Sequence, residues 1–278
     1  MAQNLIYYPT DFSKCAENAF KYALQMAKAT KSDIEIIHEI DVRAGSSASM
    51  ISKDAMGMVS MLEDDAKVKL EQLVERLKDE GVESTSKIIF GDKLSYYLKN
   101  NPSMANKMVV MGTKGTGSVE NRLFGSKTHK IIREIDFPVL VVPIEAQFDG
   151  ISDILFAADY STMNAGQFKQ LTDIGTYFHS NIHAVHVMES EEKEEISALA
   201  EEIENGIRKN TDYTQLDFQM LYATNIEERL QTMIHEDNIS LLVMVTKKRS
   251  FFERFFGTSL TKQMVYHTHV PMLVFQKK

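Results

Sequence analysis

The sequence has 278 residues, of which 44% are hydrophobic and 25% are charged, and its net charge is −8 at pH 7. This length suits about two domains with ordinary cores, and the negative charge argues against nucleic acid or an anionic membrane as a partner. A single cysteine, Cys15, excludes an intrachain disulfide and a zinc–cysteine cluster. The sequence shows no signal peptide and no apolar run that could cross a bilayer, so we expect a cytoplasmic protein.

Strand and helix signals alternate from the beginning of the chain. The strands that we expect are residues 4–8, 34–37, 87–90, 108–111 and 139–142, and the helices are residues 13–30, 62–77, 94–98 and 128–135. Ser13 or Asp11 lies near the N-cap of the first helix. Residues 43–60 are rich in Ser, Gly, Ala and Met, which predicts a loop.

The chain then repeats itself. Residues 5–13 resemble residues 153–161, and residues 137–142 resemble residues 270–275. The offset falls from 148 to 133 residues, so the first copy carries about 15 more residues, which we assign to the loop at 43–60. We expect two domains, residues 1–146 and 150–278. The second-copy strands are expected near residues 154–156, 182–187, 217–221, 241–245 and 272–275.

This alternation predicts an α/β fold, with two repeated open parallel sheets covered by helices on both faces. In such sheets, ligands bind beyond the carboxyl ends of the strands. Asp11 follows the first strand and Gly112 follows the fourth, so both reach one crevice if these strands are neighbours.

The most informative motif follows the fourth strand. It is Gly-x2-Gly-x9-Gly-Ser, formed by Gly112, Gly115, Gly125 and Ser126. Glycines allow a ligand to approach the backbone closely, and a helix start offers unpaired N–H groups with a partial positive charge. Together they predict a phosphate cradle. The ordinary alternative is a loop followed by a helix cap at Ser126. The P-loop and Rossmann glycine patterns are both absent.

These residues resemble the universal stress protein family in its tandem two-domain form. The Gly-x2-Gly-x9-Gly-Ser motif is complete, Asp11 matches the family's aspartate after the first strand, and Gly91 matches a glycine after the third. The resemblance covers essentially the whole chain, twice. It implies the strand order 3-2-1-4-5, cytoplasmic residence, dimer-like association and bound ATP. We expect any Mg²⁺ that accompanies the ATP to be shared among phosphate oxygens and water.

The resemblance also implies a role for each site residue. Asp11 would contact the adenosine part, while Gly112 and Gly115 would approach the ribose and phosphates. Met111 would line the site. The remaining positions of the expected nucleotide site are Pro9, Glu39, Gly125, Ser126 and Lys127. Glu39 stands where the family commonly has a valine near adenine, so its side chain either points away or lowers the affinity for the base.

The second copy departs from the motif. Val245 and Lys248 replace the two glycines, and Ala157 replaces the proline before Asp159. Gly257-Thr258 survives, but it is shifted by one residue. We therefore expect one nucleotide per chain, bound by the first copy.

Three histidines, His179, His183 and His186, raise the question of a metal site. Their spacings of three and four residues do not place them on one face of a strand, so a metal site is disfavoured.

The final strands of both copies are apolar and lie at sheet edges in the implied order. We therefore expect them to meet as an intramolecular pseudo-dimer, and association into a homodimer remains open.

We interpret the chain as an ATP-binding regulatory or stress-response module with no catalytic residues. The alternatives are a slow ATPase or adenylyl-transfer enzyme of the adenine nucleotide alpha hydrolase type, and an interaction module without a ligand.

Overall fold

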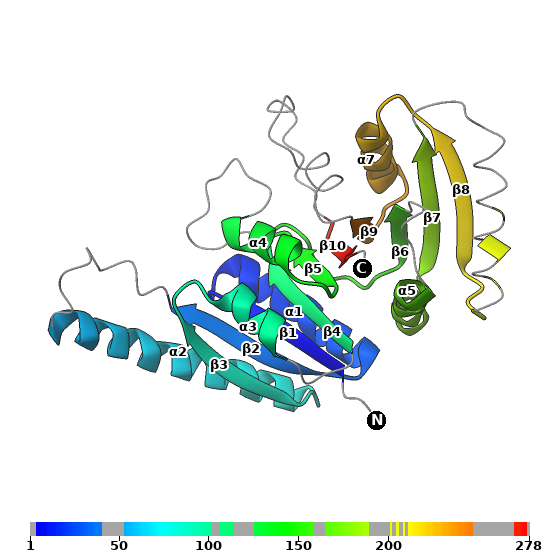
Figure 1. The fold of residues 1–278 in the computed structure, drawn as a ribbon. Coiled ribbons are helices and arrows are strands. Elements are labelled where there is room, and N and C mark those ends of the chain that lie inside the picture. The colour runs from blue at the N-terminus through cyan, green and yellow to red at the C-terminus, as the bar shows by residue number, and fades with distance from the viewer. Residues whose placement is uncertain are drawn as a thin grey trace. The chain divides into compact units, whose positions relative to one another are not determined.

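The computed structural model describes residues 4–40, 53–101, 106–113, 125–157, 165–188, 211–246 and 270–276, together with residues 201, 204, 205 and 208. The chain divides into two compact units, Met1–Phe137 and Pro138–Lys278. Each unit contains a twisted sheet with helices packed on it (Figure 1).

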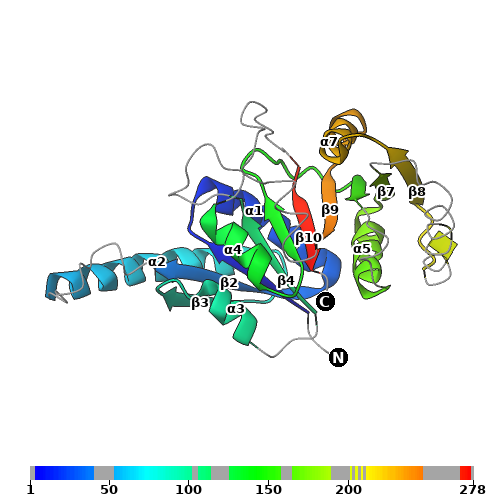
Figure 2. The ribbon, with the colours of Figure 1, turned by 45° about the horizontal axis from the view of Figure 1, so that its top comes forward.

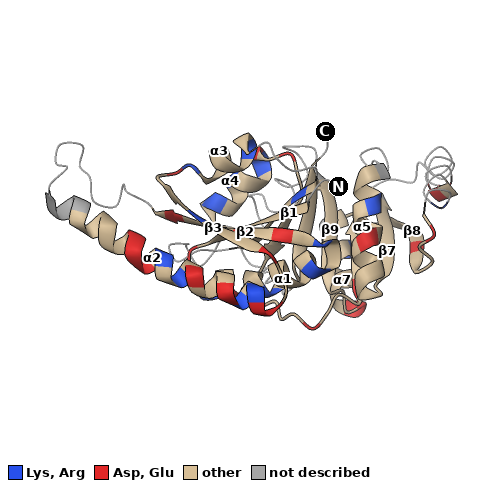
Figure 3. Ribbon diagram, turned by 90° about the horizontal axis from the view of Figure 1, so that it is seen from below, with Lys and Arg blue, Asp and Glu red and all other residues tan. Residues whose placement is uncertain are grey.

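Unit 1 is built on a parallel sheet with the order β3-β2-β1-β4. Its strands are β1 (Asn4–Thr10), β2 (Ser32–Ile40), β3 (Ser84–Phe90) and β4 (Asn106–Gly112). Its helices are α1 (Lys14–Thr30), α2 (Lys53–Asp79), α3 (Leu94–Asn100) and α4 (Ser126–Glu134). Helices α3 and α4 cover one face of the sheet and α1 and α2 cover the other (Figure 2 and Figure 3).

Unit 2 has the strand order β5-β10-β9-β6-β7-β8. Its strands are β5 (Val139–Val142), β6 (Asp153–Ala157), β7 (Asn181–Met188), β8 (Leu216–Tyr222), β9 (Leu241–Thr246) and β10 (Met272–Gln276). Its described helices include α5 (Ala165–Phe178) and α7 (Ile226–Glu236). The second copy, β8-β7-β6-β9-β10, thus has the complete 3-2-1-4-5 order, and unit 1 has the first four positions of the same order. The predicted open parallel-sheet fold is confirmed.

Strand β5 comes from the end of the first copy, yet it lies in unit 2. It runs antiparallel to β10, with Met272 opposite Val141 and Val274 opposite Val139. All four residues of β5 are buried. The prediction that the two final strands meet is therefore confirmed, and the pairing covers two apolar edges that would otherwise be open to other chains.

Helix α2 begins earlier than the sequence pattern indicates. Residues from Lys53 onward are helical, so the expected loop at 43–60 is wrong for its second part, and residues 41–52 lie outside the described residues. The first turns of α2 show no repeat of apolar residues facing the core, because the side chains of Met58 and Met61 are 64% and 75% exposed. The hydrophobic pattern therefore did not predict these turns. The core contacts of the helix begin at Ala66 and continue through Leu70.

Candidate functional site

Strands β1 and β4 end side by side at the carboxyl edge of the unit 1 sheet. They pair in parallel from Asn4 opposite Asn106 to Tyr7 opposite Val109, and each strand continues for three more residues, to Thr10 and to Gly112. These two residues are the last of their strands. Asp11 therefore leaves the sheet beside the segment that begins after Gly112, so the neighbouring strands that the crevice requires are present.

Asp11 shapes the turn between β1 and α1. Its Oδ1 accepts a hydrogen bond from the Ser13 N–H over 3.1 Å, and Phe12 within the turn has a φ of 59°. The Ser13 hydroxyl accepts from the Ala16 N–H over 3.2 Å. Of the two residues expected near the N-cap, Ser13 is therefore the cap, and Asp11 stabilises the turn before it.

His38 packs against this turn from β2. Its Nδ1 lies 2.8 Å from the carbonyl oxygen of Thr10. Because a carbonyl can only accept, Nδ1 carries the hydrogen. The imidazole stacks on Phe12 with ring centroids 4.5 Å apart. Burial lowers the pKa of His38 below its ordinary value of 6.5, and this outweighs the hydrogen bond to Thr10. The ring is therefore neutral at pH 7.

Gly112 fits against the first turn of α1. A Cβ at this position would lie 2.7 Å from the Cys15 Sγ and 3.1 Å from both the carbonyl carbon and oxygen of Cys15. The hydroxyl of the next residue, Thr113, lies 3.7 Å from the same sulfur. Packing thus requires glycine here whether or not a ligand binds, which is a reason that the sequence did not reveal.

The start of α4 is tied to the end of β4. The Gly125 N–H donates to the carbonyl oxygen of Thr113 over 2.7 Å. The buried Thr128 hydroxyl donates to the carbonyl of Gly112 over 3.1 Å and lies 3.3 Å from that of Thr113. These contacts join the two ends of segment 114–124, which contains Gly115 and lies outside the described residues.

The first turn of α4 presents free backbone donors. Gly125 is the N-cap and has no side chain to cap the helix. Within the described ranges, the N–H groups of Ser126, Lys127 and Thr128 have no hydrogen-bond acceptor. Three such donors at the positive end of a helix dipole can bind an anion.

Glu39 contacts the starts of two helices. Its Oε1 accepts from the N–H groups of Lys93 and Leu94 over 2.8 and 3.1 Å, which caps α3 from a neighbouring strand. Its Oε2 lies 2.7 Å from the Lys127 Nζ, and the Glu39 side chain is only 5% exposed. Among the described residues, the Lys127 ammonium is the ion-pair partner of Oε2. No described donor, this ammonium included, makes a hydrogen bond of good geometry to Oε2.

Further ion pairs join the α3 region to α4. Lys130 lies 2.9 Å from Asp92, and Glu134 lies 3.4 Å from Lys99. A hydrogen bond from Ser95, together with Lys99, holds the pKa of Glu134 below its usual range. Lys127, Lys130 and Glu134 follow one another along one face of α4, so that face is fixed against the α3 side of the sheet.

Two expected wall residues belong to the strands themselves. Pro9 lies within β1 opposite Ile37, and Met111 lies in β4 with 6% exposure. Both residues are buried within the sheet, next to the carboxyl ends of their strands. The structure thus places Asp11 and Gly112 on adjacent strand ends and brings Glu39 into contact with Lys127.

The corresponding edge of the second copy differs. Strand β9 runs through Val245 to Thr246, whereas β4 ends at its glycine. Val245 pairs with Phe275 and is 6% exposed, so the position that matches Gly112 is part of a buried strand. Asp159, Lys248 and Gly257-Thr258 lie outside the described residues.

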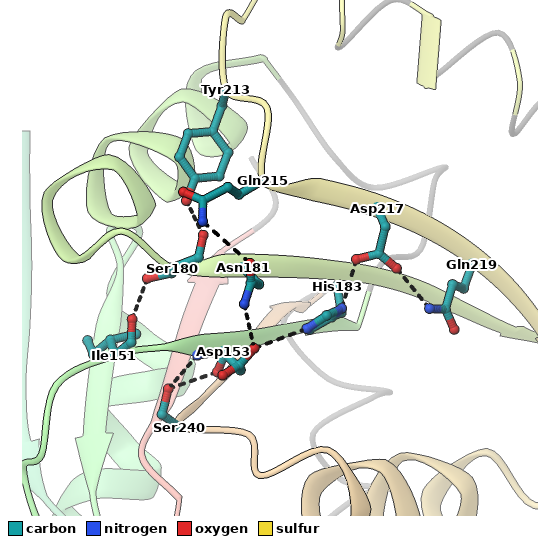
Figure 4. Close-up of polar contacts among 10 residues, drawn as sticks. All are labelled: Ile151, Asp153, Ser180, Asn181, His183, Tyr213, Gln215, Asp217, Gln219 and Ser240. Atoms are coloured by element: carbon teal, nitrogen blue, oxygen red, sulfur yellow. Dashed lines mark hydrogen bonds and ion pairs between the residues drawn. The ribbon is translucent and has the colours of Figure 1, made fainter.

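A polar cluster lies at the opposite, amino edge of the unit 2 sheet (Figure 4). His183 on β7 has its Nδ1 2.7 Å from the Asp217 Oδ1 and its Nε2 3.4 Å from the Asp153 Oδ1. Asn181 donates to the same Asp153 oxygen over 3.0 Å. Burial acts to raise the pKa of Asp153, but hydrogen bonds from Asn181, Ser152 and His183 outweigh it and hold this pKa below its usual range.

The sequence pattern does not indicate this cluster, because its members are far apart along the chain. Only the register of three strands, which places His183 opposite Asp217 and beside β6, brings them together. Across the part of the chain that the structure describes, no three or more His, Cys, Asp or Glu side chains form a group suited to a metal ion. None of the described helices is long and apolar enough to cross a membrane.

Comparisons with known proteins agree with this architecture. The sequence model of the universal stress protein family matches residues 4–143 and 151–276. Universal stress protein MJ0577 of Methanocaldococcus jannaschii is 28% identical over 151 residues, which cover 49% of this chain and 93% of that protein. Universal stress protein MJ0531 of the same organism is 25% identical over 138 residues, with coverages of 49% and 80%. The crystal structure of a universal stress protein from Archaeoglobus fulgidus has the same fold, with a TM-score of 0.73 at 15% identity over 98% of this chain and 96% of that one.

Proposed function

Because this chain belongs to the universal stress protein family along both of its copies, we propose that unit 1 binds ATP at the carboxyl edge of β1 and β4. The protein then acts as a nucleotide-dependent regulatory module of the stress response. The bound nucleotide is the signal that the module reads, and the second copy is its partner without a nucleotide.

The observation that carries this proposal is the start of α4. Three N–H groups without an acceptor among the described residues follow a glycine N-cap, and contacts from Gly125 and Thr128 hold them at the end of β4. Backbone donors in a fixed geometry at a helix N-terminus bind phosphate without losing conformational entropy on binding. We assign the phosphates to Gly125, Ser126 and Lys127. Ser126 and Lys127 supply two of these N–H groups, and the N-cap Gly125, whose N–H donates to Thr113, borders the phosphates without a side chain.

The rest of the nucleotide follows from the position of this turn. Asp11 lies on the neighbouring strand end, so we assign it to the adenosine part, with Pro9 and Met111 in the wall behind it. Gly112 and Gly115 would border the ribose and phosphates. The donors in the first turn of α4 are N–H groups and the Lys127 ammonium, which suit phosphate oxygens better than a cation. We therefore assign Mg²⁺ to phosphate oxygens and water, with no carboxylate from the described residues.

The proposal favours binding over catalysis. Phosphoryl transfer needs a base or a positioned water beside the phosphates. Among the described residues at this edge, the ionisable side chains already have other partners: Asp11 stabilises its turn, His38 donates to Thr10 and Glu39 pairs with Lys127. Binding alone does not lower a reaction barrier, so hydrolysis is slow or absent, and a turnover assay distinguishes this module from a slow ATPase.

The experiment that tests the proposal is the identification of bound nucleotide. The purified full-length chain is denatured, and any released ligand is identified by its mass. The stripped protein is then titrated with ATP by calorimetry. Release of an adenine nucleotide and saturable binding support the proposal. Absence of both would leave the interaction module without a ligand as the better account.

A further inference from the structure

Glu39 is a buried anion beside the proposed phosphate site. Its side chain is 5% exposed, and its Oε2 lies 2.7 Å from the Nζ of Lys127. Lys127 is the second residue of α4, so its ammonium belongs to the turn that holds the unpaired N–H groups. The ammonium of this helix turn and the buried carboxylate beside it are therefore in contact.

The position of Lys127 has an energetic cost that Glu39 offsets. A cation in the first turn of a helix is disfavoured, because it meets the positive end of the helix dipole. The carboxylate of Glu39 supplies the opposite charge, and it is itself fixed by the Lys93 and Leu94 N–H groups. In the protein without ligand, the positive charge of Lys127 is therefore already neutralised by the Glu39 carboxylate.

We propose that Glu39 determines the selectivity of the site for phosphate charge, because it competes with the bound phosphates for Lys127. This inference rests on the proposed function. A site with a free lysine would gain affinity with each added phosphate. In this site the lysine is shared and the carboxylate repels the phosphates, so affinity rises little from AMP to ADP to ATP. The substrate class is an adenine nucleotide whose base and sugar, rather than its phosphate number, decide binding.

The chain offers a matched control in the next ion pair along α4. Asp92 lies 2.9 Å from Lys130, but both side chains are well exposed, at 40% and 35%. Water and salt screen such a pair strongly. The variant D92N removes the same charge from the same helix region without removing a buried carboxylate, so it reports the effect of net charge alone.

The test measures dissociation constants of the full-length chain for adenosine, AMP, ADP and ATP in EDTA at fixed ionic strength. In E39Q the amide oxygen still accepts from the Lys93 and Leu94 N–H groups, so the cap of α3 is kept. We expect ATP to bind roughly tenfold more tightly to E39Q, AMP to gain less, and adenosine to gain least. D92N should change the ATP affinity by less than about twofold.

Lys127 provides the second half of the test. If Glu39 acts through this lysine, then K127Q should weaken ATP binding much more in the E39Q background than in the wild type. Equal effects of K127Q in both backgrounds would overturn the inference. So would a gain for E39Q that is the same for adenosine and ATP, since that result would place Glu39 at the base. Failure of the wild type to bind any of the four ligands would overturn the proposed function itself.

Discussion

The carbonyl oxygen of Thr113 accepts a hydrogen bond from the Gly125 N–H over 2.7 Å. This contact joins the residue after β4 to the residue before α4, so the two halves of the glycine motif, which begin at Gly112 and Gly125, lie next to each other. The contact uses the Gly125 N–H, and the N–H groups of the next three residues have no acceptor among the described residues. The motif therefore acts as one structural unit, in which the sheet fixes the helix start and the helix start presents the donors.

The first prediction concerns the packing of Gly112. In G112A the added methyl group would meet the Cys15 sulfur at 2.7 Å and its backbone at 3.1 Å, so β4 and α1 must separate. We expect a loss of roughly 1–3 kcal/mol in the free energy of unfolding, measured by denaturant titration.

Gly57 supplies the control for this measurement. It lies in α2, and a Cβ there would meet nothing within 4 Å. Because alanine is the better helix former, G57A should stabilise the protein by about 0.5–1 kcal/mol. If G112A were as stable as the wild type, the close packing of the strand end on α1 would be incorrect.

The second prediction concerns pH. Burial lowers the pKa of His38 in the folded protein below its ordinary value of 6.5. The unfolded chain therefore binds a proton more readily, and protonation favours unfolding. The contribution of His38 is complete above about pH 6.5 and is lost as the pH falls from there through the folded pKa. The unfolding free energy of the wild type should fall over this range, and that of H38Q should fall less.

This comparison removes the effect of the other titrating groups, which both proteins share. Parallel pH dependences for the wild type and H38Q would contradict the neutral, Thr10-bonded state of His38. The comparison is made by urea titration at a series of pH values from about 7.5 downward.

The third prediction is a stoichiometry of one. Val245 is buried in β9, where unit 1 has the glycine at the end of β4. A side chain there removes the close backbone approach on which the proposed site depends. Equilibrium dialysis of the full-length chain should give one ATP per chain, and a second equivalent at similar affinity would show that the second copy also binds nucleotide.

Much of the fold follows from the sequence. The apolar strand runs, the duplication and the family resemblance were enough to predict parallel sheets, and the pairing of β5 with β10 followed from two apolar edges that needed cover. The early start of α2 could not be predicted, because Met58 and Met61 face solvent and leave no core-facing period.

The site was less predictable, because its contacts depend on side-chain direction. Glu39, Lys93 and Lys127 are separated by tens of residues, and only the positions of α3 and α4 over the sheet bring them together. The close packing of Gly112 on Cys15 could not be predicted either, because Cys15 lies almost a hundred residues earlier in the chain. Sequence spacing identified the donors of the motif, but it did not identify the anion beside them.

Ser126 allows a direct test of whether the N–H groups in the first turn of α4 bind phosphate. Ser126 is the first helical residue, where proline fits a helix, and the preceding Gly125 has φ −64° and ψ 159°, which a following proline permits. S126P thus removes one donor N–H while the helix is kept, and S126A removes only the hydroxyl. In calorimetric titrations, S126P should bind ATP at least about tenfold more weakly than S126A, with both proteins equally folded. Equal ATP affinity of the two variants would contradict the account.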